Sequence, residues 1–156
     1  MRGLPAEVGG RGWWGQMKTR YKAVPTEVME KVRERSQGIC EYCGMEKATQ
    51  PHHIHLKSQG GLDIPINILY VCYTCHNHNN VQFLHHARKV LKQRIDTVFD
   101  GHKDRLYPEV EIAEKLDMRL DDVLHEMTKD FLQHRRLPGG WYSTKEQIER
   151  WLGVWL

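Results

Sequence analysis

Apolar side chains recur at helical spacing in the first two thirds of this chain. The longest such stretch starts at residue 81 and ends at Asp100–Gly101. Its apolar positions fall on one face of a helix: Val81, Leu84, Ala87, Leu91, Ile95 and Val98. A shorter stretch starts at Pro25, a residue suited to the first turn of a helix, and ends at Gly38. We therefore predict two amphipathic helices in this part of the chain.

Between these helices the apolar pattern is that of strands. Residues 50–56 alternate weakly between polar and apolar positions, and residues 68–72 are apolar with branched or aromatic side chains. Gly60–Gly61 marks a turn between them, and a short helix is expected from Thr74 onward. A β-hairpin followed by a helix is thus the predicted centre of the chain, and the fold class is α+β.

The last third returns to helical spacing. One helix is expected from Pro108–Glu109, and a second follows a break at residues 117–119. Ser143 with Glu146 forms a capping-box pattern for a final helix. We expect three parts in all: an arm over residues 1–23, a domain over 24–101, and a mainly helical region over 106–156.

Length and composition are those of a small globular protein. The chain has 156 residues, of which 40% are hydrophobic and 28% charged. No apolar run approaches the length of a membrane span. Residues 1–20 lack the apolar segment of a signal peptide, so we expect the chain to stay in the cytoplasm.

Charge is distributed unevenly along the chain. Residues 1–105 hold 16 Lys and Arg against 10 Asp and Glu, whereas residues 106–156 hold 7 against 10. The arm over residues 1–23 adds Trp13–Trp14 to several basic side chains. A basic half suits a polyanion, and double-stranded DNA is the partner we expect. Solvated basic side chains are the alternative explanation.

The four cysteines form two Cys-x-x-Cys pairs, Cys40 with Cys43 and Cys72 with Cys75, separated by 28 residues. Two residues between the thiolates let one turn present both sulfurs to one ion, and two such pairs complete a tetrahedral shell. In a reducing compartment, metal binding is favoured over disulfides. We predict a structural Zn²⁺ with no open coordination position.

The segment that contains both cysteine pairs resembles the HNH endonuclease family, in the zinc-ribbon, ββα-metal subgroup common in phages. The similarity covers about residues 25–80 and rests on the order and spacing of several features. These are the segments ICEYCG, QPHHIHLKSQGG and NILYVCYTCHN. The resemblance implies a metal-dependent endonuclease that hydrolyses phosphodiester bonds and leaves 5′-phosphate and 3′-hydroxyl ends.

The resemblance also implies roles for individual residues. His53 would be the general base, and the side-chain oxygen of Asn67 would hold its ring in one orientation. His52 and His76 would bind the catalytic ion. His52 and His53 are neighbours on a predicted strand, so their side chains point to opposite faces.

Two positions depart from the commonest family pattern. Many members carry Asp or Glu where His52 stands. The third ligand is often a His four residues after the second, and here that position is Asn80. We expect its amide oxygen to lie one helical turn from His76 and to complete the site. Mg²⁺ or Mn²⁺ is the expected ion, and the imidazole ligands also admit Ni²⁺ or Zn²⁺.

Four further residues are candidates for DNA contacts: Lys57, Gln59, Lys89 and Lys92. The C-terminal segment RRLPGGWYSTKEQIERWL resembles the excisionase-like winged helix-turn-helix, which would add a second DNA contact. The alternative, which we favour, is a helical cap or dimerisation element that buries Trp141, Trp151 and Trp155. A homodimer is compatible with either.

Two other functions remain open. One is a resolvase specific for branched DNA, which requires a dimer with two sites. The other is a zinc-ribbon module that binds DNA or assists packaging without catalysis. The amino-acid sequence does not decide which DNA sequence is preferred or what the oligomeric state is. It also does not decide whether one strand or both strands are cut.

Overall fold

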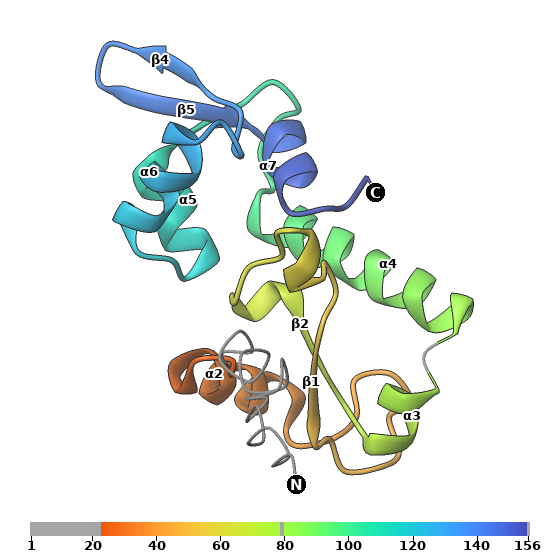
Figure 1. The fold of residues 1–156 in the computed structure, drawn as a ribbon. Helices are drawn as coiled ribbons and strands as arrows, with labels where there is room; N and C mark the ends of the chain where they lie inside the picture. Colours follow the sequence, from red (N-terminus) through yellow and green to blue (C-terminus); the bar gives the residue numbers. More distant parts are fainter. Residues whose placement is uncertain (1–22, 79, 156) are drawn as a thin grey trace, which may run out of the picture.

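A β-hairpin lies at the centre of the N-terminal half of the protein (Figure 1). The computed structural model describes residues 23–78 and 80–155, so the predicted basic arm and its two tryptophans lie outside the described residues. Strand β1 (Gln50–His53) pairs antiparallel with β2 (Ile68–Val71). His52 stands opposite Leu69 in this register, and His53 opposite Ile68.

Three helices surround the hairpin. Helix α2 (Thr26–Ser36) packs on β2, the short helix α3 (Tyr73–Asn77) follows β2 directly, and α4 (Val81–Val98) comes next. Two 3₁₀ turns, η1 (Lys57–Gln59) and η2 (Pro65–Asn67), lie in the long loop between the strands. All four residues of β2 are buried, because α2 covers one side and the cysteine pairs with the first turns of α4 cover the other. The predicted ββα centre is thus present.

A network of three charged side chains ties these elements together. Glu41, in the first cysteine loop, accepts hydrogen bonds from Arg35 of α2 and from Arg94 of α4. Both guanidinium groups also donate to the backbone carbonyl of Ile68 at the start of β2. The sequence pattern gives no sign of this network, because a charged residue on a helix is usually solvated.

The C-terminal part is a helix-turn-helix followed by a β-hairpin. Strand β3 (Leu106–Pro108) leads into α5 (Glu109–Leu116), α6 (Leu120–Thr128), β4 (Arg135–Leu137), β5 (Gly140–Thr144) and α7 (Lys145–Trp151). The three strands form an antiparallel sheet in the order β3-β5-β4. This order of elements is the one that the winged helix-turn-helix resemblance implies.

Two details of this region differ from the sequence-based prediction. The residue that caps α7 is Thr144, one position later than expected, and it forms a reciprocal capping box with Gln147. The hydroxyl of Ser143 is buried and donates instead to the backbone carbonyl of Gln133. Trp151 is buried, but Trp155 is 62% exposed, so the expected burial of all three tryptophans is wrong.

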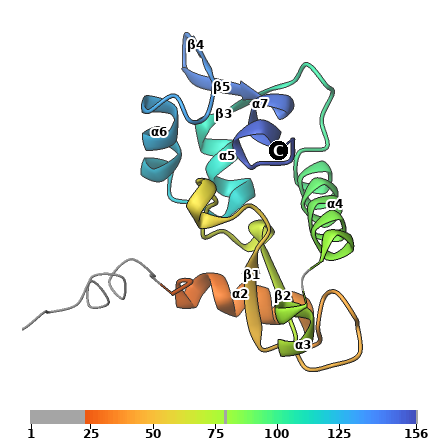
Figure 2. The same cartoon turned by 45° about the vertical axis from the view of Figure 1, so that its right-hand side comes forward.

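The two halves of the chain share one hydrophobic core. Leu91, Ile95 and Phe99, at the end of α4, pack in the same cluster as Ile112 of α5 and Ile148 of α7. Figure 2 shows the C-terminal part placed against the end of the hairpin, with α4 alongside. Removing residues after Gly101 would expose this core, so the C-terminal part is integral to the fold. Among the described helices, none has the length and apolar character needed to cross a membrane.

Candidate functional site

The four cysteine side chains converge on one point. The Sγ atoms of Cys40, Cys43, Cys72 and Cys75 all lie within 4.8 Å of one another. In a tetrahedral zinc site with Zn–S bonds of about 2.3 Å, the sulfurs are about 3.8 Å apart. In each pair the amide of the second cysteine donates to the sulfur of the first. The cluster is therefore positioned to bind a metal ion, and four thiolates suit zinc.

The thiols of the cluster differ in how readily they ionise. Amide hydrogen bonds from Glu46 and then Met45 lower the pKa of the Cys43 thiol to about 7. Burial, and then the neighbouring sulfur of Cys72, raise the pKa of the Cys75 thiol. Crowded thiols oppose one another's ionisation, and a bound cation removes that opposition.

A second group of metal-ligating side chains lies where β1 meets α3. The rings of His52 and His76 have centroids 5.8 Å apart. His52 is only 7% exposed, and its Nε2 atom is buried without a hydrogen-bond partner. Burial, and then the charges of His76 and His53, lower the pKa of His52 to about 4. A neutral imidazole with an unused ring nitrogen suits a metal ligand.

The depressed pKa of His52 predicts a pH-dependent stability. Its folded-state pKa of about 4 lies below the ordinary value of 6.5, so the unfolded chain binds more protons between these values. Stability is full above pH 6.5 and is lost as the pH falls towards 4. From pH 7 to pH 5 we expect His52 to account for a loss of about 2 kcal/mol in the free energy of unfolding.

Urea denaturation of zinc-loaded wild type and His52→Gln at both pH values measures this loss. The cysteine site contributes equally in the two proteins, so their difference isolates His52. An equal loss in both proteins would contradict the prediction.

His53 is held by a carboxylate that sequence analysis missed. Its Nε2 lies 2.7 Å from Oδ1 of Asp63, and the other oxygen of Asp63 accepts from Lys57 at 2.7 Å. A carboxylate is an acceptor, so Nε2 carries the proton, and Nδ1 is left as the acceptor of the neutral ring. His53 lines a hollow of about 170 Å³ together with His52, His76, Lys57 and others.

Asp63→Asn should lower any activity that depends on His53. An amide can present its NH₂ group to Nε2 and so favour the wrong tautomer, and losing such a carboxylate partner typically costs about 10- to 100-fold. We expect a loss of this size in cleavage rate with an unchanged melting temperature. In a His53→Ala background the same change should have no further effect on cleavage. An additive loss there would show that Asp63 acts elsewhere.

The predicted role of Asn67 is wrong. Its amide does not hold the His53 ring but closes the loop between the strands. Oδ1 accepts from the backbone amide of His55, and Nδ2 donates to the carbonyls of His55 and Leu62. The side chain is 2% exposed. Asn67 therefore fixes the loop that carries Asp63, and its influence on His53 is indirect.

The predicted helical relation between Asn80 and His76 is also wrong. Helix α3 ends at Asn77, and Asn80 is the N-cap of the next helix, where its Oδ1 accepts from the amide of Phe83. The break separates residues that a continuous helix would align. Among the described His, Cys, Asp and Glu side chains, only the four cysteines form a metal-binding group of three or more. His52 and His76 therefore remain the protein's candidate ligands for a second ion.

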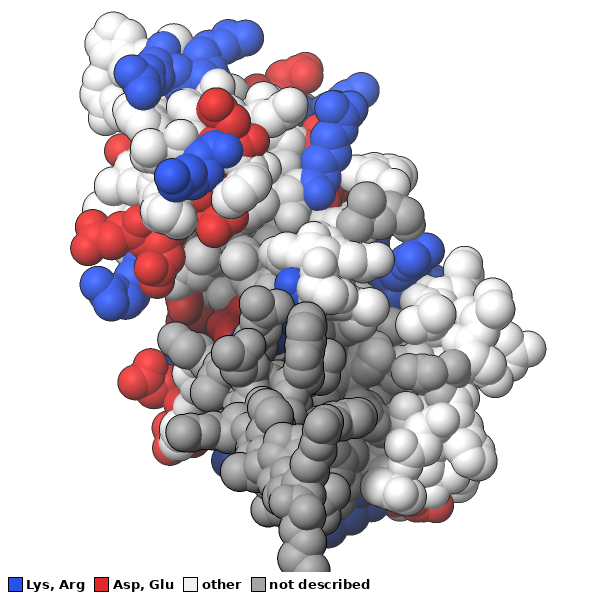
Figure 3. Space-filling view, in the orientation of Figure 1, with Lys and Arg blue, Asp and Glu red and all other residues white. Residues whose placement is uncertain are grey.

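The candidate DNA contacts have different environments. Lys57 pairs with Asp63 beside the hollow, and Gln59 and Lys89 are exposed. Lys92 pairs with Asp96 and with the buried Glu149, so its charge is already neutralised within the protein. On the face drawn in Figure 3, Lys and Arg lie among Asp and Glu over the C-terminal part. The DNA contacts stay predictions.

Comparison with known proteins finds one family model for the segment that contains both cysteine pairs. Residues 40–82 match the family model described as HNH endonuclease. This segment is thus similar to HNH endonuclease domains, as the resemblance suggested, and such a domain suggests a nuclease or DNA-binding function. No curated protein and no solved structure matches the chain.

Proposed function

We propose that this protein is a metal-dependent DNA endonuclease that hydrolyses phosphodiester bonds with His53 as its general base. The observation that carries the proposal is the His53–Asp63 pair beside the two facing imidazoles of His52 and His76. These residues supply a base with a fixed tautomer and two imidazole ligands within one small hollow. The match of residues 40–82 to the HNH endonuclease family supports DNA as the substrate.

The proposed reaction follows from these side chains. The Nδ1 atom of His53 takes a proton from water, and the water oxygen forms a bond to phosphorus while the bond to the leaving oxygen breaks. Asp63 stabilises the imidazolium that results, because its carboxylate already accepts from Nε2. A divalent ion held by His52 and His76 would neutralise the charge that builds up on the phosphate.

The test is a cleavage assay on zinc-loaded protein with supercoiled plasmid and a branched DNA substrate. Each is incubated with Mg²⁺, with Mn²⁺ and with neither, so that the structural metal is not stripped by a chelator. We expect strand cleavage only when a divalent ion is added. Cleavage confined to the branched substrate would instead support a resolvase. Binding to either DNA without ion-dependent cleavage would support a non-catalytic zinc-ribbon module.

A further inference from the structure

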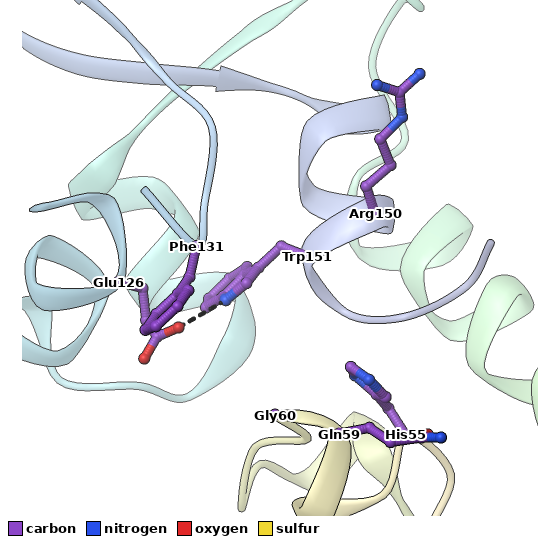
Figure 4. Close-up of a pocket in the computed structure, with 7 residues that line it drawn as sticks. All are labelled: His55, Gln59, Gly60, Glu126, Phe131, Arg150 and Trp151. Carbon is purple, nitrogen blue, oxygen red and sulfur yellow. Dashed lines mark hydrogen bonds between the residues drawn. The ribbon is translucent and has the colours of Figure 1, made fainter. Parts of the chain in front are cut away.

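A second cavity lies on the other side of the loop that borders the catalytic hollow. It has a volume of about 380 Å³ and is lined by residues from the hairpin loop, from the end of α6 and from α7. The lining residues are His55, Gln59, Gly60, Glu126, Phe131, Arg150 and Trp151 (Figure 4). We propose that this cavity binds an unpaired nucleobase of the DNA strand that is cut. The inference rests on the proposed nuclease function and names its preferred substrate.

Two aromatic rings form one wall of the cavity. Trp151 is 8% exposed, and its Nε1 donates to Oε2 of Glu126 at 2.9 Å, which fixes the plane of the indole. Phe131 lies beside them in Figure 4 and is 64% exposed. Nucleobases stack on such rings irrespective of sequence. The wall therefore offers a flat apolar surface at an open edge.

The backbone at the end of α6 determines why Phe131 points outward. Asp130 has a positive φ of 57°, and the amides of both following residues donate to the carbonyl of Glu126. This turn places Leu132 in the core, where it is fully buried, and leaves Phe131 at the cavity. The same turn thus buries one apolar side chain and presents the next one, a phenyl ring, at the edge of the cavity.

The opposite wall has an unsatisfied polar group. His55 is 8% exposed, and its Nε2 is buried with no hydrogen-bond partner. In Figure 4 its ring stands up from the hairpin loop towards α7. Leaving a buried ring nitrogen unpaired is unfavourable, and a polar group of a ligand that reaches it would relieve this. Nucleobases carry amino and imino donors on their edges.

The charged groups of the lining suit a neutral ligand. The lining holds one carboxylate, Glu126, and one guanidinium, Arg150, so their formal charges balance. One oxygen of Glu126 already accepts from Trp151. The phosphates of the same strand would remain outside, near the hollow where Lys57 and His53 lie. A nucleobase is a neutral aromatic group attached to a charged backbone, so the base would fill the cavity while its phosphates stay at the hollow.

The position of the cavity connects it to the reaction. The turn η1 contributes Lys57 and Ser58 to the catalytic hollow, and Gln59 to the cavity. The hollow and the cavity therefore share the turn η1 as a common border. A nucleotide beside the scissile phosphate can therefore turn out of the stack and enter the cavity. This costs least where the base is already unpaired.

The test compares binding of two duplexes that differ only in one unpaired base. His53→Ala protein in Mg²⁺ serves as the parent, because it should bind without cutting. We expect the parent to bind the duplex with the unpaired base about tenfold more tightly than the paired one. Phe131→Ala should reduce this ratio to near one. Trp155→Ala removes a ring of similar exposure from another part of the surface, and it should leave the ratio unchanged.

A second readout locates the base. With 5-iodouracil as the unpaired base, ultraviolet crosslinking should map by mass spectrometry to Phe131 or Trp151. An affinity ratio near one in the parent, or an unchanged ratio in Phe131→Ala, would overturn the inference. If wild-type protein still cuts plasmid DNA in that case, the nuclease function stands and only the nucleobase site falls. If wild-type protein never cuts DNA but the affinity ratio behaves as expected, the nucleobase site stands and the nuclease function falls.

Discussion

Replacing His53 by alanine is expected to abolish DNA cleavage and to leave the folded, zinc-loaded protein intact. His53 is the only described ring that lines the catalytic hollow with one nitrogen fixed by a carboxylate. General-base catalysis contributes about 10²- to 10⁴-fold, so the rate of plasmid cleavage should fall by that factor. Asp63 keeps its ion pair with Lys57 in the variant, so no unpaired charge is left to destabilise the loop.

The measurement is the initial rate of plasmid nicking in Mg²⁺ or Mn²⁺, with zinc content and melting temperature on the same samples. His85→Ala is the matched control, because His85 is an exposed histidine on α4 outside the hollow. The control should cut at the wild-type rate. If the His53→Ala protein cuts at the wild-type rate, the assignment of the general base is refuted. A fall in zinc content would show that His53 has a structural role.

Exchanging Cys72 for serine is expected to remove the metal and the fold together. Serine preserves the size of the side chain and can still cap α3, as the Cys72 sulfur does through the amide of Cys75. What the exchange removes is a soft thiolate ligand. Structural zinc contributes about 10–16 kcal/mol of apparent binding energy in small zinc domains, which exceeds the net stability of many folded proteins.

Metal analysis and thermal unfolding monitored by circular dichroism test this expectation. Wild-type protein treated with a strong chelator should show the same loss as Cys72→Ser, and chelator should have no further effect on the variant. A variant with native circular dichroism and an undiminished melting temperature would contradict a structural metal. Because Cys75 and His76 are adjacent, cleavage should also be lost when the cysteine site is disrupted.

The elements of the N-terminal half were predictable from local patterns. The apolar spacing of α4 and the apolar run of β2 both appear at the expected places. Where the prediction of Asn80 failed, the cause was a helix boundary, since the chain stops α3 at Asn77 and begins α4 with Asn80 as its cap. Asn is a strong N-cap residue, so the sequence does carry a signal for a helix boundary at this position.

No local sequence pattern indicated that His53 and Asp63 form a hydrogen-bonded pair. Ten positions separate the two residues, and Asp63 lies in an irregular loop where no periodicity places its side chain. The loop acquires its shape from Asn67, which bonds the backbone at His55 and Leu62. An aspartate near Gly60–Gly61 is ordinarily taken as part of a turn.

The sequence by itself determined the four-cysteine cluster, the HNH resemblance and the α+β class, because ligand spacing and strand-turn-helix order are local properties. Only the tertiary structure decided which group orients His53, that Asn67 closes a loop, and that α4 joins the winged C-terminal part through a shared core. It also placed Phe131 and Trp151 opposite His55 across one cavity. These relations join residues distant in sequence, and packing rather than local preference brings them together.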